Sequence, residues 1–269
     1  MPSVNTNVGA LVAQKYLRAT TTEMNMVQNR VSSGLRVASA LDDASSFSVG
    51  AGMRADIKSY TAAAGALQGA KVGAQVAVSA GETIAKRLED VKAKVVQMAD
   101  ESLSTASRAA YQSDLDSMVA EVNNYLAQAE YNGVNLLGSG GADVLVVANI
   151  DASVITMRNQ DVGDISGGSI GSISSSADAS NVLSQLASFK SDLDTALAEL
   201  GADLKQIDAQ TEFVKQTEET VKIGLGALVD ADLAKESANL QSLQVRQQLG
   251  IQAIGIANQS PQALLGLFR

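Results

Sequence analysis

The chain has 269 residues, of which 46% are hydrophobic but only 3% aromatic, so we expect a core of aliphatic side chains and alanine. It contains no cysteine and no histidine, which excludes disulfides, thiolate catalysis and the commonest general base and metal ligand. The formal charge of −9 argues against a nucleic-acid partner, and no apolar run reaches the ~18 residues that membrane insertion needs. No cofactor is expected.

Residues 6–33 are predicted to form a helix, because apolar side chains recur on one face at steps of three and four. The large ones are Leu17, Met24, Val27 and Val31. Gly34 supplies a stop for this helix, and a linker follows over residues 35–41. Asp42 or Asp43 is then expected to cap the start of a second helix, and we favour this capping role over a cation site.

The second helix is rich in alanine and glycine in its first half and then carries a regular stripe. The stripe consists of Ile84, Leu88, Val91, Val95 and Met98. A break is expected over residues 102–107, and a third helix then ends at an Asn132-Gly133 turn. Two β-branched runs at 143–149 and 153–159 predict a β-hairpin. Residues 163–181 are rich in glycine and serine and are expected to form a loop.

From Val182 to Leu228 one apolar stripe continues with only Thr211 and Glu218 polar, which is the spacing of a coiled-coil seam. The helix would be roughly 70 Å long, more than the about 47 Å diameter of a compact chain of this size. A last helical segment, 231–258, has Leu233, Leu240, Leu243, Ile251 and Ile254 on one face. The expected fold is mainly α, an elongated coiled-coil-like bundle of paired N- and C-terminal segments with a small β-hairpin insert.

The two terminal segments have few large apolar side chains for their length. Burial of the face between Ala10 and Val31 releases less free energy than the ordering of its backbone consumes, and pairing with the C-terminal helix still leaves apolar flanks in water. We infer that the ends become ordered only when neighbouring copies bury them. The predicted polymerisation residues are Leu17, Met24, Val27, Val31, Leu240, Leu243, Ile251, Ile254, Leu264 and Leu265.

Three motifs in the chain resemble those of the bacterial flagellins. Ser3–Asn7 (SVNTN) and Val31–Val37 (VSSGLRV), followed by Asp-Asp-Ala from Asp42, are similar to the opening signature of that family. Tyr131–Leu137 (YNGVNLL) is similar to its F-N-G-x-x-L-L segment, with tyrosine in place of phenylalanine. Ala257–Leu265 (ANQSPQALL) resembles its C-terminal tail. The motifs lie in the family's order and cover both ends and the middle.

The resemblance implies a subunit that polymerises into an extracellular motility filament. Residues 1–41 and 231–269 would line the inner wall of its tube, and residues 42–230 would form the outer-wall bundle with the hairpin and the loop. The short insert at 138–180 would make this a minimal subunit without large outer domains. The partners implied are further copies of the chain or sister flagellins, the flagellar export apparatus and its chaperone, and the cap and hook-junction proteins. Export through the flagellum's own channel needs no cleaved signal peptide.

Some flagellins carry a zinc peptidase insert, but a chain without histidine cannot hold that site, so no enzyme activity is expected. The glycine-rich stretch Gly167–Gly171 lacks the lysine and the strand-to-helix context of a phosphate-binding loop. Flagellins are often O-glycosylated on outer loops, and the resemblance therefore makes four serines candidates for modification. They are Ser172, Ser174, Ser175 and Ser176.

An animal innate receptor senses flagellins through the first outer-wall helix. Where strongly stimulating members have L-Q-R-V-R-E-L, this chain has L-E-D-V-K-A-K from Leu88 to Lys94. Asp90 reverses a positive charge, and Lys92 replaces an arginine and loses its bidentate fork. Weak recognition by that receptor is expected.

Two alternatives to a filament subunit remain open from the sequence. A hook–filament junction protein would share the terminal helices but form only a short ring. An intracellular coiled-coil scaffold or signalling protein would instead have ordered ends in the isolated chain and would form no filament.

Overall fold

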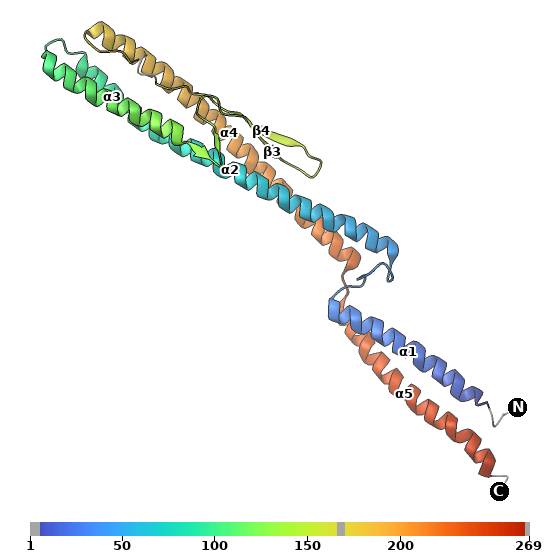
Figure 1. Cartoon of the computed structure of the whole chain (residues 1–269). Helices are drawn as coiled ribbons and strands as arrows, with labels where there is room; N and C mark the ends of the chain where they lie inside the picture. Colours follow the sequence, from blue (N-terminus) through green and yellow to red (C-terminus); the bar gives the residue numbers. More distant parts are fainter. Residues whose placement is uncertain (1–5, 166–169, 267–269) are drawn as a thin grey trace. The chain divides into compact units, whose positions relative to one another are not determined.

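The computed structural model describes residues 6–165 and 170–266, with the backbone alone from residue 260 onward. Within these ranges the chain forms five helices and four short strands, so it is mainly α as expected (Figure 1). It divides into two compact units. The terminal unit comprises residues 1–55 and 220–269, and the central unit comprises residues 56–219. The division expected from the sequence, at 41/42 and 230/231, refers to positions in a filament and stays a prediction.

Two long helices supply most of the central unit. α2 (Ala44–Met98) and α4 (Ser176–Val229) are each continuous. The predicted stripe on α2 is confirmed as core, and the stripe on α4 is mostly buried as far as Val214 and partly buried from Val221 to Leu228. The stripe on α2 from Ile84 to Met98 is at most 3% exposed, and Leu193, Leu200, Ile207 and Val214 on α4 are fully buried. The two helices approach closely at Gly81, where a Cβ atom would lie 2.6 Å from Cδ2 of Leu197.

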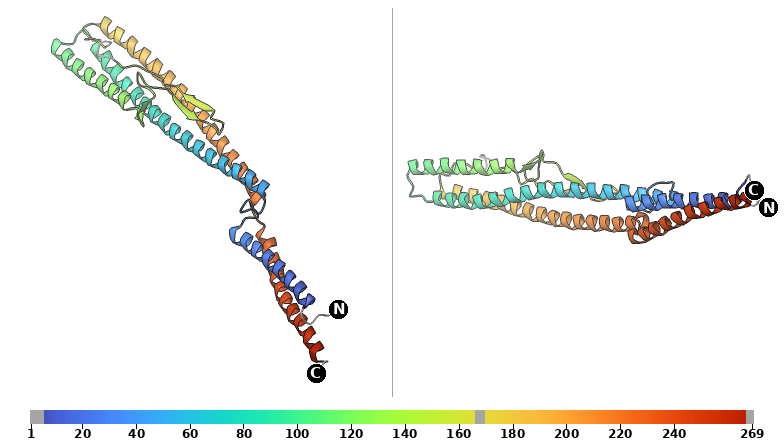
Figure 2. Two further views of the ribbon diagram at one scale, coloured as in Figure 1. Left: turned by 45° about the vertical axis from the view of Figure 1, so that its right-hand side comes forward. Right: turned by 90° about the horizontal axis from the view of Figure 1, so that it is seen from below.

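α3 (Thr105–Gln128) packs along α2 in the same unit (Figure 2). Lys94 of α2 pairs with Asp114 of α3 at 2.6 Å. The break between the helices falls at residues 99–104, slightly earlier than expected. The reason is local capping: Ser104 accepts a hydrogen bond from the Ser107 N–H at 3.1 Å, and Arg108 donates to the Met98 carbonyl at 2.7 Å.

Two antiparallel hairpins lie between α3 and α4. β1 (Glu130–Tyr131) and β2 (Val134–Asn135) form a small hairpin that the sequence indicated only as a turn. Asn132 and Gly133 at its tip have φ of 53° and 82°, the conformation of a tight hairpin turn. β3 (Val144–Val147) and β4 (Val154–Met157) pair as predicted, with Val146 opposite Ile155.

The segment before α4 differs from the plain loop that was expected. α4 already begins at Ser176, and the residues leading to it are anchored in the central unit. Ile165, Ile170 and Ile173 are all at most 4% exposed. Asn123 of α3 accepts a hydrogen bond from the Ile165 N–H and donates to its carbonyl. The described residues of this segment are therefore packed against the central unit and do not form an open loop, and we call the segment the strap. Residues 166–169 lie outside the described part.

The terminal unit is built on α1 (Val8–Ser33) and α5 (Leu233–Gly266), which run side by side (Figures 1 and 2). Asn7 caps α1 by accepting from the Ala10 N–H at 3.1 Å, and its side-chain amide donates to the Ala257 carbonyl at 2.7 Å. Gly34 ends α1 in the left-handed conformation at φ 73°, as predicted. Among the described helices, none combines the length and the apolar character of a membrane span.

A candidate polymerisation surface on the terminal helices

The predicted polymerisation residues mostly line the seam between α1 and α5 of the same chain. Val27 and Leu243 are buried, and Leu17, Met24, Val31, Leu240 and Ile254 are partly buried. The helices are close at Gly250, where a Cβ atom would meet Cδ1 of Leu17 at 3.3 Å. Ile251 instead is 57% exposed. Leu264 and Leu265 lie in α5, but their side chains are outside the described residues.

A second set of large apolar side chains on these two helices faces solvent, each 47–70% exposed. We call it the outer apolar set. It consists of Val8, Leu11, Val12, Tyr16, Met26, Leu233, Val245, Leu249, Ile251 and Ile256. Of this set, only Ile251 was predicted from the sequence to be a polymerisation residue. The sequence did contain a signal for the others, because apolar residues of these helices occupy more than one face, which a simple two-helix pair does not require.

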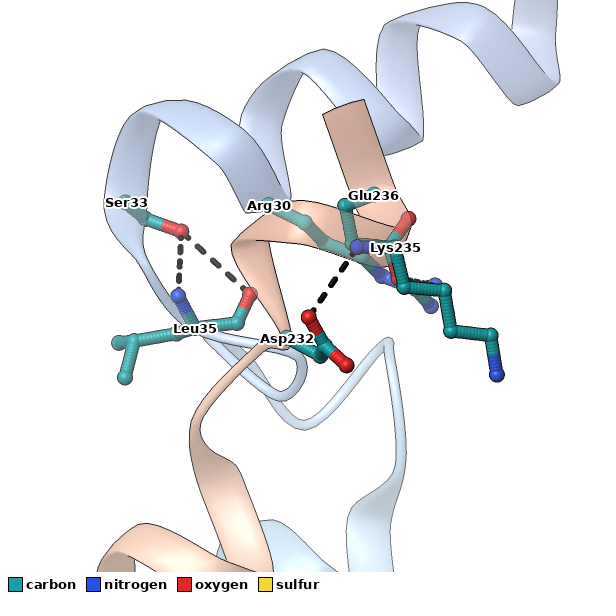
Figure 3. Close-up of polar contacts among 6 residues, drawn as sticks. All are labelled: Arg30, Ser33, Leu35, Asp232, Lys235 and Glu236. Atoms are coloured by element: carbon teal, nitrogen blue, oxygen red, sulfur yellow. Dashed lines mark hydrogen bonds and ion pairs between the residues drawn. The ribbon is translucent and has the colours of Figure 1, made fainter. Parts of the chain in front are cut away.

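The end of the pair nearest the linkers, which we call the joint, contains an ion pair whose carboxylate is buried (Figure 3). Arg30 of α1 lies 3.5 Å from Oε1 of Glu236 on α5, whose side chain is only 11% exposed. Oε2 of Glu236 is buried and has no hydrogen-bond partner among the described residues. Asp232 caps α5 by accepting from the Ala234 and Lys235 N–H groups, both at 3.1 Å.

The two linkers at the joint are tied to each other by backbone hydrogen bonds. The N–H groups of Arg36 and Val37 donate to the Val229 carbonyl at 2.7 and 3.2 Å, and the Ala231 N–H donates to the Gly34 carbonyl at 2.9 Å. Val37 and Val229 are both at most 2% exposed. A single chain therefore already fixes the end of α1 against the start of α5.

The acidic pair after the first linker has capping roles. Oδ1 of Asp43 accepts from the Ser45 and Ser46 N–H groups at 3.0 and 3.2 Å, which confirms it as the cap of α2. Asp42 accepts from Ser39 and Ala38 and pins the preceding turn. Hydrogen bonds from Ser39 lower the pKa of Asp42, and those from Ser46 lower the pKa of Asp43. Across the described residues, no group of three or more potential metal-ligating side chains occurs.

The four candidate serines differ in their surroundings. The Ser174 hydroxyl donates to Oδ2 of Asp178 at 2.7 Å, and the Asp178 N–H donates to Oγ of Ser175 at 3.2 Å, so both serines belong to the cap of α4. Hydrogen bonds from Ser174 and Ser175 lower the pKa of Asp178 to about 2. Ser172 and Ser176 are exposed.

The two receptor-region residues both lie on the exposed side of α2. Asp90 is 3.6 Å from Nη1 of Arg87, one turn before it, and Lys92 is exposed. The neighbouring Leu88 and Val91 are buried core residues.

Comparison with known proteins gives matches along almost the whole chain. Residues 4–140 match the bacterial flagellin N-terminal helical region, and residues 179–268 match the bacterial flagellin C-terminal helical region. Flagellin FljO of Caulobacter vibrioides is 36% identical over 269 residues, covering 99% of this chain and 98% of the relative. A flagellin of Brucella melitensis is 37% identical over 289 residues, covering all of both chains.

Among solved structures, a flagellar hook-associated protein from Vibrio parahaemolyticus is similar with a TM-score of 0.61. It is 14% identical, and the match covers 70% of this chain and 100% of that protein. A likeness at this identity shows a shared fold alone, and no finding favours the hook–filament junction or the intracellular scaffold interpretation. The matches at both ends, and relatives of equal length, show that the chain belongs to the bacterial flagellin family and is a structural subunit that polymerises into the extracellular flagellar filament.

Proposed function

We propose that α1 and α5 are the part of this flagellin that drives polymerisation. The observation that carries the proposal is the outer apolar set. Among the described residues of the two helices, Val27 and Leu243 are the buried apolar side chains, whereas the outer apolar set leaves ten others largely in water. Burial of each such side chain by a neighbouring copy contributes ~1.5–3 kcal/mol. Residues 1–41 and 231–269 would thus form the inner wall, and residues 42–230 the outer wall.

The order of the helix pair is expected to spread outward from the joint. The joint is tied by backbone hydrogen bonds in the single chain, whereas the rest of the pair gains little from its own seam. In free subunits we expect slow amide exchange at residues 27–33 and fast exchange at residues 8–20. In filaments both segments become protected. Equal protection of residues 8–20 in the two states would contradict the proposal.

A substitution series tests the outer apolar set directly. Leu249→Ser and Ile256→Ser remove exposed apolar groups from α5, and each is expected to raise the critical concentration for seeded polymerisation about tenfold or more. Gln248→Ser is the matched control, because it changes an exposed polar residue beside Leu249. An unchanged critical concentration in both apolar variants would refute the assignment, and sedimentation of the polymer measures it.

The assembly route follows from the family. We expect export through the flagellar channel without a cleaved signal peptide, with a chaperone, the cap and hook-junction proteins as transient partners. Sister flagellins are further expected partners, because Caulobacter vibrioides has several relatives of equal similarity. No catalytic role is expected. Mass spectrometry of the secreted protein measures whether a leader is cleaved. We expect the N-terminal segment to be present in all of the secreted protein.

Ser172 and Ser176 are the preferred candidates for O-glycosylation of the four serines. A sugar on Ser174 would remove its O–H donor to Oδ2 of Asp178, and a sugar on Ser175 would crowd the Oγ that accepts from the Asp178 N–H. Ser172 and Ser176 are exposed and take no part in these two hydrogen bonds. Peptide mapping of native filaments tests this preference, and a sugar confined to Ser174 or Ser175 would contradict it.

Recognition by the innate receptor is expected to be weak. Asp90 and Lys92 are exposed on α2, so the reversed charge and the missing guanidinium would face a bound receptor. Reporter-cell activation equal to that of a strongly stimulating flagellin would refute this expectation.

A further inference from the structure

We propose that Leu41 of one subunit inserts into an apolar hollow between α2 and the β3–β4 hairpin of a neighbouring subunit. The inference goes beyond the role of the terminal helices and rests on the polymerisation of the chain. It assigns one interaction surface of the filament to two separate places on the same sequence.

The first part of this surface is an exposed apolar side chain on a hydrogen-bonded turn. Leu41 lies in the linker between α1 and α2 and is 98% exposed, the highest value among the large apolar residues described. Oδ2 of its neighbour Asp42 accepts hydrogen bonds from the Ala38 and Ser39 N–H groups at 3.1 and 2.9 Å, and the Asp42 N–H donates to the Ser39 carbonyl at 3.1 Å. These hydrogen bonds fix the backbone of the turn from which Leu41 projects, so less backbone entropy is lost when a partner buries the side chain.

The second part is a hollow of about 380 Å³ in the central unit. Small residues of α2 form its floor, namely Ala66, Gly69, Ala70 and Gly73. Leu145, Val147 and Tyr131 stand at its edge and are 65%, 43% and 41% exposed. An apolar hollow surrounded by exposed apolar side chains is typical of a protein–protein contact, and its volume is sufficient for a leucine side chain with an adjoining residue.

The chemistry of the other hollows favours this one as the partner of Leu41. The hollow beside Lys92 is lined by Glu89, Lys190 and Asp194, and the one beside the joint is lined by Arg30 and Arg36. A third hollow, at the start of α1, carries no charge, but most of its lining is polar: Thr6, Asn7, Gln14 and Asn258. Burial of a leucine against these charged or polar groups would take away their water without supplying new hydrogen-bond partners. The alanine and glycine residues of α2 that line the hollow beside β3 and β4 carry no polar side chains, so burial of a leucine there has no such desolvation cost.

Symmetry supplies the reason why the two parts belong to different copies. An open helical polymer needs heterologous contacts, in which one patch of a subunit meets a different patch of the next. A projecting side chain and a separate hollow on one sequence meet this requirement, and each subunit offers one of each. The same contact can therefore repeat along the filament without closing into a ring.

Cysteine cross-linking tests the contact cleanly, because the chain has no native cysteine. Subunits with Leu41→Cys and subunits with Leu145→Cys are prepared separately, mixed with an excess of the unsubstituted chain, polymerised and oxidised mildly. The excess keeps filaments forming even if either variant assembles poorly. Since the two substitutions are on different chains, a disulfide between positions 41 and 145 joins two copies. The matched control replaces Leu145→Cys by Val96→Cys, an exposed position on α2.

We expect disulfide-linked dimers joining positions 41 and 145 in filaments, at a yield at least tenfold above the control pair, and none in unpolymerised subunits. A yield equal to that of the control in normally formed filaments would overturn the contact. Failure of the unsubstituted chain to polymerise would instead count against the polymerisation itself. As a second readout, Leu41→Ser is expected to raise the critical concentration about tenfold or more, and an unchanged value would also overturn the proposal.

Discussion

The ion pair at the joint leads to the prediction that its two members are energetically unequal. Glu236 is 11% exposed, and one of its oxygens is buried without a partner among the described residues, which costs ~1–3 kcal/mol. Its ion pair offsets little of this cost, because Arg30 is 35% exposed and 3.5 Å away, so solvent screens the attraction to about 1 kcal/mol or less. The helix dipole at the start of α5 adds ~0.3–1 kcal/mol in its favour.

For Glu236, the cost of burying the carboxylate nearly cancels the two stabilising contributions. For Arg30, no burial cost offsets the attraction that its removal would lose. We expect Glu236→Met to leave the stability of the joint nearly unchanged or to raise it by up to about 1 kcal/mol, because the methionine fills similar space without a charge. Arg30→Met loses the attraction while the carboxylate stays buried, and it is expected to cost about 1 kcal/mol. The double variant should recover most of that loss, since no buried charge remains.

Amide exchange of residues 27–33 and 236–243 in free subunits measures the opening free energy of the joint. Circular dichroism of the four proteins controls for loss of helix elsewhere. The reasoning is refuted if Glu236→Met costs as much as Arg30→Met, because the ion pair would then stabilise the joint by itself. It is also refuted if the double variant is as unstable as Arg30→Met alone.

Two further predictions concern the central unit. Hydrogen bonds from Ser174 and Ser175 lower the pKa of Asp178 from 3.8 to about 2 in the folded chain, so its capping stabilises the start of α4 above about pH 4 and the stabilisation is lost as the pH falls toward 2. Amide protection factors at residues 176–180, corrected for the intrinsic exchange rate at each pH, should fall over that window, and Asp178→Ala should remove this pH dependence. Gly81→Ala places a Cβ atom 2.6 Å from Leu197 and should destabilise the unit by ~1–3 kcal/mol in urea unfolding. Gly65→Ala is the control: its Cβ meets open space, so it should stabilise α2 by ~0.5–1 kcal/mol. Equal effects of the two substitutions would show that α2 and α4 can accommodate the added methyl group at Gly81.

The helices were predictable because their signals are local. Gly34 at φ 73° ends α1 where the sequence indicated, and the stripe on α4 could be followed along one face without knowledge of its partner. The second hairpin was also indicated, since β3 and β4 are β-branched runs around a short turn. A periodic apolar face reports its own secondary structure because the period is set by the backbone of that segment alone.

The strap before α4 was not predictable in the same way. Its glycine and serine content predicted an open loop, yet Ile170 and Ile173 are buried and Asn123 of α3 fixes the backbone at Ile165. Isolated isoleucines in a polar segment have no period to indicate a buried face. The α3 residues that anchor this segment, Asn123 at Ile165 and Gln112 at Ile173, lie 42 and 61 positions away.

The amino-acid sequence by itself determined the helical class, the hairpin insert and the flagellin motifs, because each is recorded in neighbouring residues. Only the tertiary structure decided which apolar side chains of α1 and α5 face each other and which remain in water. Ile251 and Ile254 were both predicted on one face of the last helix, but Ile254 is partly buried whereas Ile251 is 57% exposed. The burial of the Glu236 carboxylate beside Arg30 likewise appears only when α1 and α5 are brought together. Burial is a property of what a side chain meets, and those partners lie on distant parts of the chain.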